Sequence, residues 1–297
     1  MEERIHTMSF LHVTFSLLLS VLIMESAIVH ASEVPPDALR VCSDPNNLPY
    51  SNRAEEGFEN KIAELIASDL KLELEYTWFP QRMGFIRNTL KYWDDEEERF
   101  RCDLVMGVPV GFDISDTTMP YYRSTYVLVF KAKGPLAGID TAEAFSDLPM
   151  EQKKALRIGA FTRSPAVDWL NKFNLFENTT FYQIMTGDSD YYPGKIIEDE
   201  LVPGNLDVVL MWGPIAGYFA SRHPDADLRV IPMLNQPGFN FDFAMAMGVR
   251  RHESDWKGRI EKSIAENQKA IQNILEQYQV PLVAVPSAGL STIGGNN

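Results

Sequence analysis

The sequence is poor in the residues that most enzymes and metal sites use. It has two cysteines and five histidines in 297 residues, and three of the histidines, His6, His12 and His30, lie within the first 31 residues. It contains neither a Ser/His/Asp pattern nor a Cys-x-x-Cys or His-x-x-x-His spacing. Because histidine and cysteine supply most general bases, nucleophiles and zinc ligands, we predict no catalysis, no metal site and no bound cofactor.

Long apolar runs are missing after residue 31, so no later segment is predicted to span a membrane. Within the first 31 residues, residues 10–24 are almost all apolar or small, and Val29-His30-Ala31 offers a small-x-small cleavage site before Ser32. A short apolar run followed by such a site predicts a signal peptide over residues 1–31. A non-cleaved anchor is the alternative.

Basic residues are outnumbered, with 27 lysines and arginines against 41 acids and a formal net charge of −14. An acidic surface repels nucleic acid and anionic lipid, so we predict neither as a partner. It would attract a basic protein, although many exported proteins are simply acidic. The densest run is the five acids of residues 94–98, which predicts an exposed loop. A calcium or lanthanide site there is the alternative, but consecutive acids lack the alternate spacing of a coordinating loop.

The two cysteines, Cys42 and Cys102, lie at the edges of predicted strands, residues 39–43 and 103–108. In an oxidising compartment such a pair often forms a disulfide. Closing a loop of this length would stabilise the fold by roughly 4 kcal/mol in the chain-entropy model. Two separate buried thiols are the alternative.

From residue 39 onward the chain alternates strand and helix signals. Strands are predicted over residues 39–43, 71–79, 103–108, 124–130, 156–161, 179–184, 207–211, 228–231 and 242–249. Helices are predicted over residues 58–70, 82–92, 165–173, 194–201, 214–222 and 253–278. This alternation predicts an α/β fold with a largely parallel sheet covered by helices.

Two crossing segments, residues 131–138 and 235–238, divide this alternation into two units. We predict lobe 1 over residues 32–132 and 236–281, lobe 2 over residues 133–235, and a disordered Gly/Ser/Pro-rich tail over residues 282–297. Two such units joined by two crossings form two lobes around a cleft. Ligands of these sheets bind outside the carboxyl ends of the strands.

Loops after these strand ends, and the segment before residue 124, carry the candidate cleft residues. They combine aromatic rings, amides and guanidinium groups, which suit an aromatic or anionic group or a protein hot spot. Each also has an ordinary structural explanation, because Asp and Asn cap turns and tryptophans close cores. The candidates are Asp44, Asn46, Asn47, Tyr50, Trp78, Gln81, Arg82, Tyr121, Tyr122, Arg123, Arg163 and Trp212.

Four motifs together resemble one group of periplasmic proteins. They are VCSDPNNLPY (41–50), GFENKIAEL (57–65), TWFPQRMGFIRNTL (77–90) and PYYRSTYV (120–127). Over residues 39–281 the chain resembles the MoxJ/XoxJ group, solute-binding-protein homologues associated with quinoprotein methanol dehydrogenases. The resemblance implies a type II periplasmic binding protein fold (solute-binding protein family 3), a periplasmic location, and a calcium- or lanthanide-dependent quinoprotein as partner. It does not imply that this chain binds the quinone or the metal.

The sequence departs from the amino-acid receptors of that fold where they hold their ligand. They use an arginine for the carboxylate, yet no Lys or Arg lies between Arg101 and Arg123. Their ammonium-binding Asp falls at Trp212, and their Gly-Thr-Thr turn falls at Arg163-Ser164-Pro165. Losing one charge-assisted contact costs roughly 1.5–3 kcal/mol, so we predict that the cleft holds no free amino acid. Replacement of the carboxylate clamp by Arg82 or Arg163 is the alternative.

These features predict a non-enzymatic periplasmic accessory protein of a PQQ-dependent methanol dehydrogenase. It would aid assembly or activation of the dehydrogenase by binding a protein or peptide segment in its cleft. A second hypothesis is an ABC-transporter receptor for a small non-amino-acid solute. A third is an enzyme that uses a cleft acid such as Asp44, Asp116 or Asp242.

Overall fold

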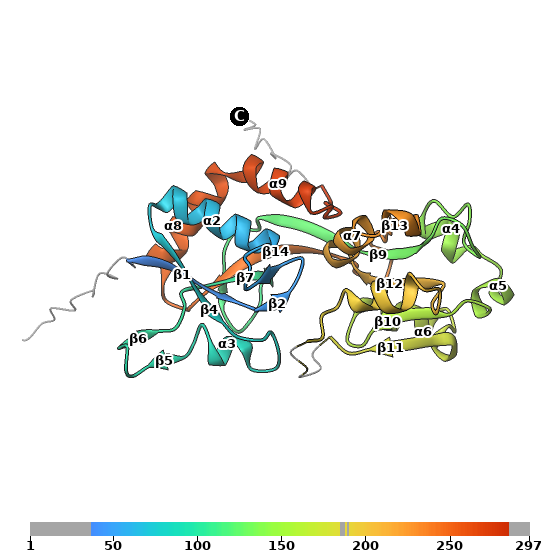
Figure 1. Ribbon diagram of the computed structural model, residues 1–297, viewed down its shortest axis with the longest axis horizontal. Coiled ribbons are helices and arrows are strands. Elements are labelled where there is room, and N and C mark those ends of the chain that lie inside the picture. Colours follow the sequence, from blue (N-terminus) through green and yellow to red (C-terminus); the bar gives the residue numbers. More distant parts are fainter. Residues whose placement is uncertain (1–36, 185–187, 189, 285–297) are drawn as a thin grey trace, which may run out of the picture. The chain divides into compact units, whose positions relative to one another are not determined.

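The computed structural model describes residues 37–184, 188 and 190–284 (Figure 1). The predicted signal peptide and residues 285–297 of the predicted tail lie outside this part of the chain. Within it, no helix combines the length and the apolar character that crossing a bilayer requires.

A mixed sheet of ten strands runs through the described chain, and it positions all the loops discussed below. Its main path is β11 (Thr179–Tyr182), β10 (Ile158–Phe161), β12 (Val208–Trp212), β9 (Tyr122–Lys131), β14 (Asp242–Val249), β7 (Leu104–Pro109), β1 (Ala38–Ser43) and β4 (Glu73–Trp78). Two further strands lie off this path: β13 (Leu228–Pro232) pairs with β9, and β8 (Asp116–Thr117) pairs with β14.

The sheet is parallel only at its two ends. The set β4-β1-β7 is parallel, and so is the set β11-β10-β12. Between them, β9 and β14 run antiparallel to their neighbours and to each other. A parallel pair needs a crossover connection, usually a helix, and the described links into β9 and β14 contain none. The prediction of a largely parallel sheet was therefore wrong for these two long central strands.

Helices cover the sheet as the amphipathic patterns predict, with two changes of length. They are α2 (Phe58–Leu70), α3 (Phe85–Asn88), α4 (Ala142–Ser146), α5 (Met150–Lys154), α6 (Pro165–Lys172), α7 (Gly213–Ser221), α8 (Ser254–Glu266) and α9 (Gln268–Gln277), with a π-helical turn at Ile196–Leu201. The helix predicted over residues 82–92 shrinks to α3, because Gly84 precedes it in the left-handed region at φ 88°. The helix predicted over residues 253–278 is divided at Asn267. The short helices α4 and α5 were not predicted.

The apolar cores form separately at the two ends of the sheet. One core packs α2, α8 and α9 against β1, β7 and β14, and these helices contact one another (Figure 1). On the other side of β9, one core lies beneath α4 and α6 and another beneath α7. The chain then returns to β9, where Leu282 forms an antiparallel bridge with Ser124. The first residues of the predicted tail thus pair with the start of β9.

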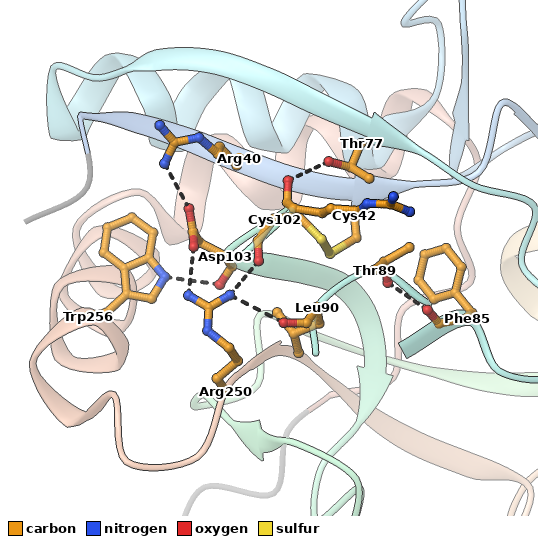
Figure 2. Close-up of a disulfide and its surroundings, with 11 residues drawn as sticks. Arg40, Cys42, Thr77, Phe85, Thr89, Leu90, Cys102, Asp103, Arg250 and Trp256 are labelled. Carbon is orange, nitrogen blue, oxygen red and sulfur yellow. Dashed lines mark hydrogen bonds and ion pairs between the residues drawn. A yellow bond between two sulfur atoms is a disulfide. The ribbon is translucent and has the colours of Figure 1, made fainter. Parts of the chain in front are cut away.

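A disulfide joins Cys42 in β1 to Cys102 just before β7, which confirms the predicted pairing (Figure 2). Around it, the Arg250 guanidinium donates to the Leu90 and Cys102 carbonyls and pairs with Asp103 at 2.6 Å. These contacts anchor the excursion, defined as the segment of residues 79–101 between β4 and β7, where the chain rejoins the sheet. Its tip is the short hairpin β5 (Trp93–Asp94) and β6 (Arg99–Phe100), where the run of five acids begins at Asp94 and its residues 95–98 are exposed.

Candidate functional site

A cavity of about 450 Å³ lies at the carboxyl ends of the parallel strands. Eight of the twelve candidate residues line it: Asp44, Asn46, Asn47, Tyr50, Gln81, Arg82, Arg163 and Trp212. Within each parallel set the strands end at the same edge, so loops that are distant in sequence meet there. The two sets run in opposite directions, and loops from the carboxyl ends of both sets line this cavity. The loops after β1, β4 and β10 and the end of β12 therefore supply these side chains.

The structure places the other four candidates away from the cavity. Trp78 stacks on Tyr76, with ring centroids 4.7 Å apart. Tyr121 and Tyr122 are core residues, because β9 begins at Tyr122 and packs these rings beneath α2. Arg123 is held in an ion pair with Asp242 across the β9–β14 pair. Asp242, a candidate acid of the enzyme hypothesis, is therefore also occupied.

The polar loop after β1 both caps a turn and faces the cavity. The Asp44 carboxylate accepts hydrogen bonds from the backbone amides of Asn46, at 2.8 Å, and of Gln81. The Asn47 side-chain amide donates to Gln81 Oε1 at 2.8 Å. These bonds tie the loop after β1 to the loop after β4, so the lining on this side is held by its own polar groups.

An aromatic wall, defined as Tyr126, Trp212 and Phe243, forms one side of the cavity. The ring centroids of Trp212 lie 5.4 Å from those of Tyr126 and 5.9 Å from those of Phe243. The wall comes from three strands, since Tyr126 lies in β9, Trp212 ends β12 and Phe243 lies in β14. Burial raises the pKa of Tyr126 to about 12, so its hydroxyl stays neutral. The sequence analysis missed Tyr126 and Phe243, although period-two alternation along both strands could have indicated them.

Glu59 is the buried acid of the cavity, and the sequence analysis missed it too. It is the second residue of α2, only 9% exposed, and lines the cavity. Burial raises the pKa of its carboxyl to about 8, an effect that the neighbouring Tyr121 hydroxyl only partly offsets. Gly107 makes room for it, because an added Cβ would lie 2.3 Å from Glu59 Oε1. An acid in the first turn of a helix has an ordinary explanation in the helix dipole, so its position alone gave no signal.

Two exposed arginines, Arg82 and Arg163, also line the cavity, and neither forms an ion pair within the described chain. Arg163 has a φ of 58°, a left-handed conformation that is unusual for arginine. The acids Asp44 and Asp188 share the lining. Among the residues that the structure describes, no three His, Cys, Asp or Glu side chains gather in an arrangement that could hold a metal ion.

No protein-family model matches the chain. The crystal structure of the periplasmic binding protein XoxJ from Methylobacterium extorquens AM1 is 34% identical, covers 84% of this chain and 100% of that chain, and superposes with a TM-score of 0.67. Protein MoxJ from Paracoccus denitrificans is 24% identical over 260 residues, which are 82% of this chain and 89% of MoxJ.

An ancestral arginine-binding protein bound to glutamine is similar in fold alone, at 19% identity and a TM-score of 0.53, with 82% of this chain and 98% of that chain covered. The fold class predicted from the sequence is confirmed by these similarities.

Proposed function

Because the chain belongs to the MoxJ/XoxJ group of periplasmic binding-protein homologues, we propose that it acts in the periplasm as a non-enzymatic accessory protein of a PQQ-dependent methanol dehydrogenase. The observation that carries this proposal is the altered ligand site. In the sequence comparison, Trp212 falls at the position where the amino-acid receptors are expected to place their ammonium-binding acid. In the structure, its ring packs against Tyr126. A free amino acid would find an indole in place of a carboxylate at that position.

We further propose that the cavity receives a segment of the dehydrogenase and so aids its assembly or activation. Aromatic and arginine side chains are the residues that most often dominate protein interfaces. A volume of about 450 Å³ suits one or two side chains of a partner. The cleft residues of this proposal are the eight lining candidates together with Tyr126 and Phe243. We also propose that the two lobes have the boundaries predicted from the sequence: residues 32–132 and 236–281 for lobe 1, and residues 133–235 for lobe 2.

A capture experiment tests the proposed function. The exported protein, immobilised, is exposed to periplasm from methanol-grown cells, beside Trp212→Ala and the matched control Trp93→Ala. Trp212 lies on the cavity, whereas Trp93 is exposed on the hairpin outside it. We expect the wild type and Trp93→Ala to retain the quinoprotein and Trp212→Ala to lose most of it. An eluate without quinoprotein contradicts the proposal, and equal capture by all three proteins contradicts the role of the cavity.

A transport receptor for a small non-amino-acid solute is the second candidate. The cavity volume favours it, since small-molecule pockets of proteins span about 300–1,000 Å³. A thermal-shift screen of small metabolites separates the two functions. One metabolite that raises the melting temperature in proportion to its occupancy would support the receptor, whereas stabilisation by the dehydrogenase alone would support the accessory protein.

A further inference from the structure

Glu59 is a buried acid without a cation. It is nine-tenths buried and lines the cavity, and no described lysine or arginine pairs with it. Taking an isolated carboxylate out of water costs so much that such a group neutralises instead. The carboxyl therefore faces the cavity as a carboxylic acid, which carries one O–H donor.

The neighbours of the Glu59 carboxyl are uncharged groups that favour its protonated form. The Tyr121 hydroxyl lies beside the Glu59 carboxyl, and the Tyr122 hydroxyl is buried without a hydrogen-bond partner in the part of the chain that the structure describes. Both pKa values lie well above that of an exposed tyrosine, because burial and the nearby acid oppose ionisation. Gly107, at φ 64°, brings the β7 backbone against the carboxyl where any other residue would displace it. The groups that lie against the carboxyl, the Tyr121 hydroxyl and the Gly107 backbone, are uncharged.

We propose that Glu59 is the specificity-determining residue of the cavity: its carboxylic acid donates a hydrogen bond to an uncharged oxygen, a carbonyl or a hydroxyl, of a ligand whose apolar body lies against the aromatic wall. This inference rests on the cavity being the binding site proposed above. The oxygen belongs either to a free solute or to a side chain or backbone of a partner segment. In both cases a cationic group binds at this position only after Glu59 has released its proton, so an uncharged oxygen is preferred.

Two probes that share an aromatic ring and are similar in size but differ in charge test the proposal. Benzamide carries a neutral carbonyl on an aromatic ring, and benzylammonium carries a cation on the same ring. In ligand-observed NMR titrations of the exported protein at pH 7, we expect benzamide to bind about tenfold more tightly, as one well-made hydrogen bond allows. Tighter binding of benzylammonium, or no binding of benzamide, would overturn the proposal.

Two substitutions distinguish the effect of the hydrogen-bond donor of Glu59 from the effect of its side-chain volume. Glu59→Gln keeps a neutral donor and should retain benzamide, whereas Glu59→Leu keeps the bulk without the donor and should bind about tenfold more weakly. Equal binding by Glu59→Leu would overturn the proposal. Should Glu59→Leu fail to fold, infrared difference spectra of wild type against Glu59→Gln at pH 7 give an independent reading. The band of a protonated carboxyl is expected there, and its absence would overturn the proposal.

The pH dependence gives a second signature. Benzamide binding by the wild type should decline as the pH rises through about 8, where Glu59 ionises, and Glu59→Gln should remove this decline. Burial raises the pKa values of the lining tyrosines, so they stay neutral in this range. The other charged groups on the lining are present in both proteins and cancel in the comparison: Asp44, Asp188, Arg82 and Arg163. An identical decline in both proteins would assign the effect to another group.

Competition distinguishes the two sources of the oxygen. Displacement of captured dehydrogenase by benzamide assigns the oxygen to the partner segment, and benzamide binding without displacement assigns it to a free solute. Both results uphold the Glu59 site. Benzamide binding in a protein that captures no dehydrogenase would contradict the accessory function and leave this site intact, so the two proposals fail separately.

Discussion

At the residue scale, Glu59 links stability to pH. Its pKa is about 8 in the folded protein, against an ordinary value of 4.5. Between these values the folded protein holds a proton that the unfolded chain has released, so the free energy of unfolding falls as the pH rises through this window. We expect a loss on the order of a few kcal/mol between pH 5 and pH 8, measured by urea unfolding.

The control for this prediction is another acid of the same helix. Glu59→Gln should flatten the profile, whereas Glu64→Gln should leave it unchanged, because Glu64 is exposed and only pairs with Lys61 at the surface. A wild-type profile without a decline between pH 5 and pH 8 would show that Glu59 ionises normally despite its burial.

Substitutions of Arg163 can distinguish the backbone strain at this position from the role of its side chain. Its φ of 58° costs a non-glycine residue roughly 1–2 kcal/mol. Arg163→Gly and Arg163→Ala both remove the guanidinium, but only glycine relieves the strain. We expect Arg163→Gly to be more stable than Arg163→Ala by about 1 kcal/mol in denaturant unfolding. Equal stabilities would mean that the turn relaxes when the arginine is removed.

The positions of single residues show what strand direction can and cannot indicate from the sequence. Polar residues in the loops that follow parallel strands, such as Asp44, Gln81 and Arg163, line the cavity because strand direction places these loops there. Tyr121 and Arg123 do not, because they lie at the start of an antiparallel strand whose partners the sequence did not reveal. Glu59 could not be predicted, since its burial depends on Gly107 and Tyr121, which lie far along the chain and meet it only in the fold.

At the element scale, the disulfide secures the excursion between β4 and β7. It closes a separation of 60 residues, which corresponds to roughly 4 kcal/mol in the chain-entropy model. The double variant Cys42→Ser/Cys102→Ser should lose stability of that order, measured by denaturant unfolding of the purified variant. A strong reductant should lower the melting temperature of the wild type and leave that of the double variant unchanged.

Arg250 is the second fastening of this excursion. It donates to two backbone carbonyls and pairs with Asp103, whose side chain is only 11% exposed. Removing one partner of a buried ion pair costs about 3–5 kcal/mol when the other charge is left alone. Because Arg40 also pairs with Asp103 at 3.4 Å, Arg250→Met should destabilise the protein by about the lower end of that range. The neighbouring Arg251 is exposed, and Arg251→Met should change the unfolding midpoint little. Similar effects of the two substitutions would refute a special role for Arg250.

Element prediction worked where one physical signal dominates. The apolar spacing of residues 58–70 gives α2 with the predicted bounds, and the buried run at residues 242–249 gives β14. It failed where local backbone chemistry intervenes. Gly84 in the left-handed region delays α3, and Asn267, which donates its side-chain amide to the Ser263 carbonyl, divides the last helix. Apolar periodicity continues through such residues and so cannot reveal them.

At the scale of the whole molecule, the continuous sheet predicts one cooperative unfolding transition. The strands β9 and β14 pair with each other and each also pairs with one of the parallel sets. Ile62→Ala and Leu170→Ala empty buried positions in different cores and should each cost about 2–5 kcal/mol. Calorimetry should show both shifting the same single peak, with calorimetric and van't Hoff enthalpies equal. Two separable peaks would show that the cores melt independently.

The segment that follows α9 reaches elements of both ends of the sheet. The Ser124 hydroxyl donates to the Pro281 carbonyl, and the Val283 amide donates to the Arg123 carbonyl. The Gln279 carbonyl packs so closely on Gly217 of α7 that any side chain there would displace it. Residues 279–283 therefore hold α7 and the start of β9 together, and this contact bears on the order in which the fold forms. However early the individual helices form, the native arrangement of α7 and the start of β9 requires residues 279–283 to be in place.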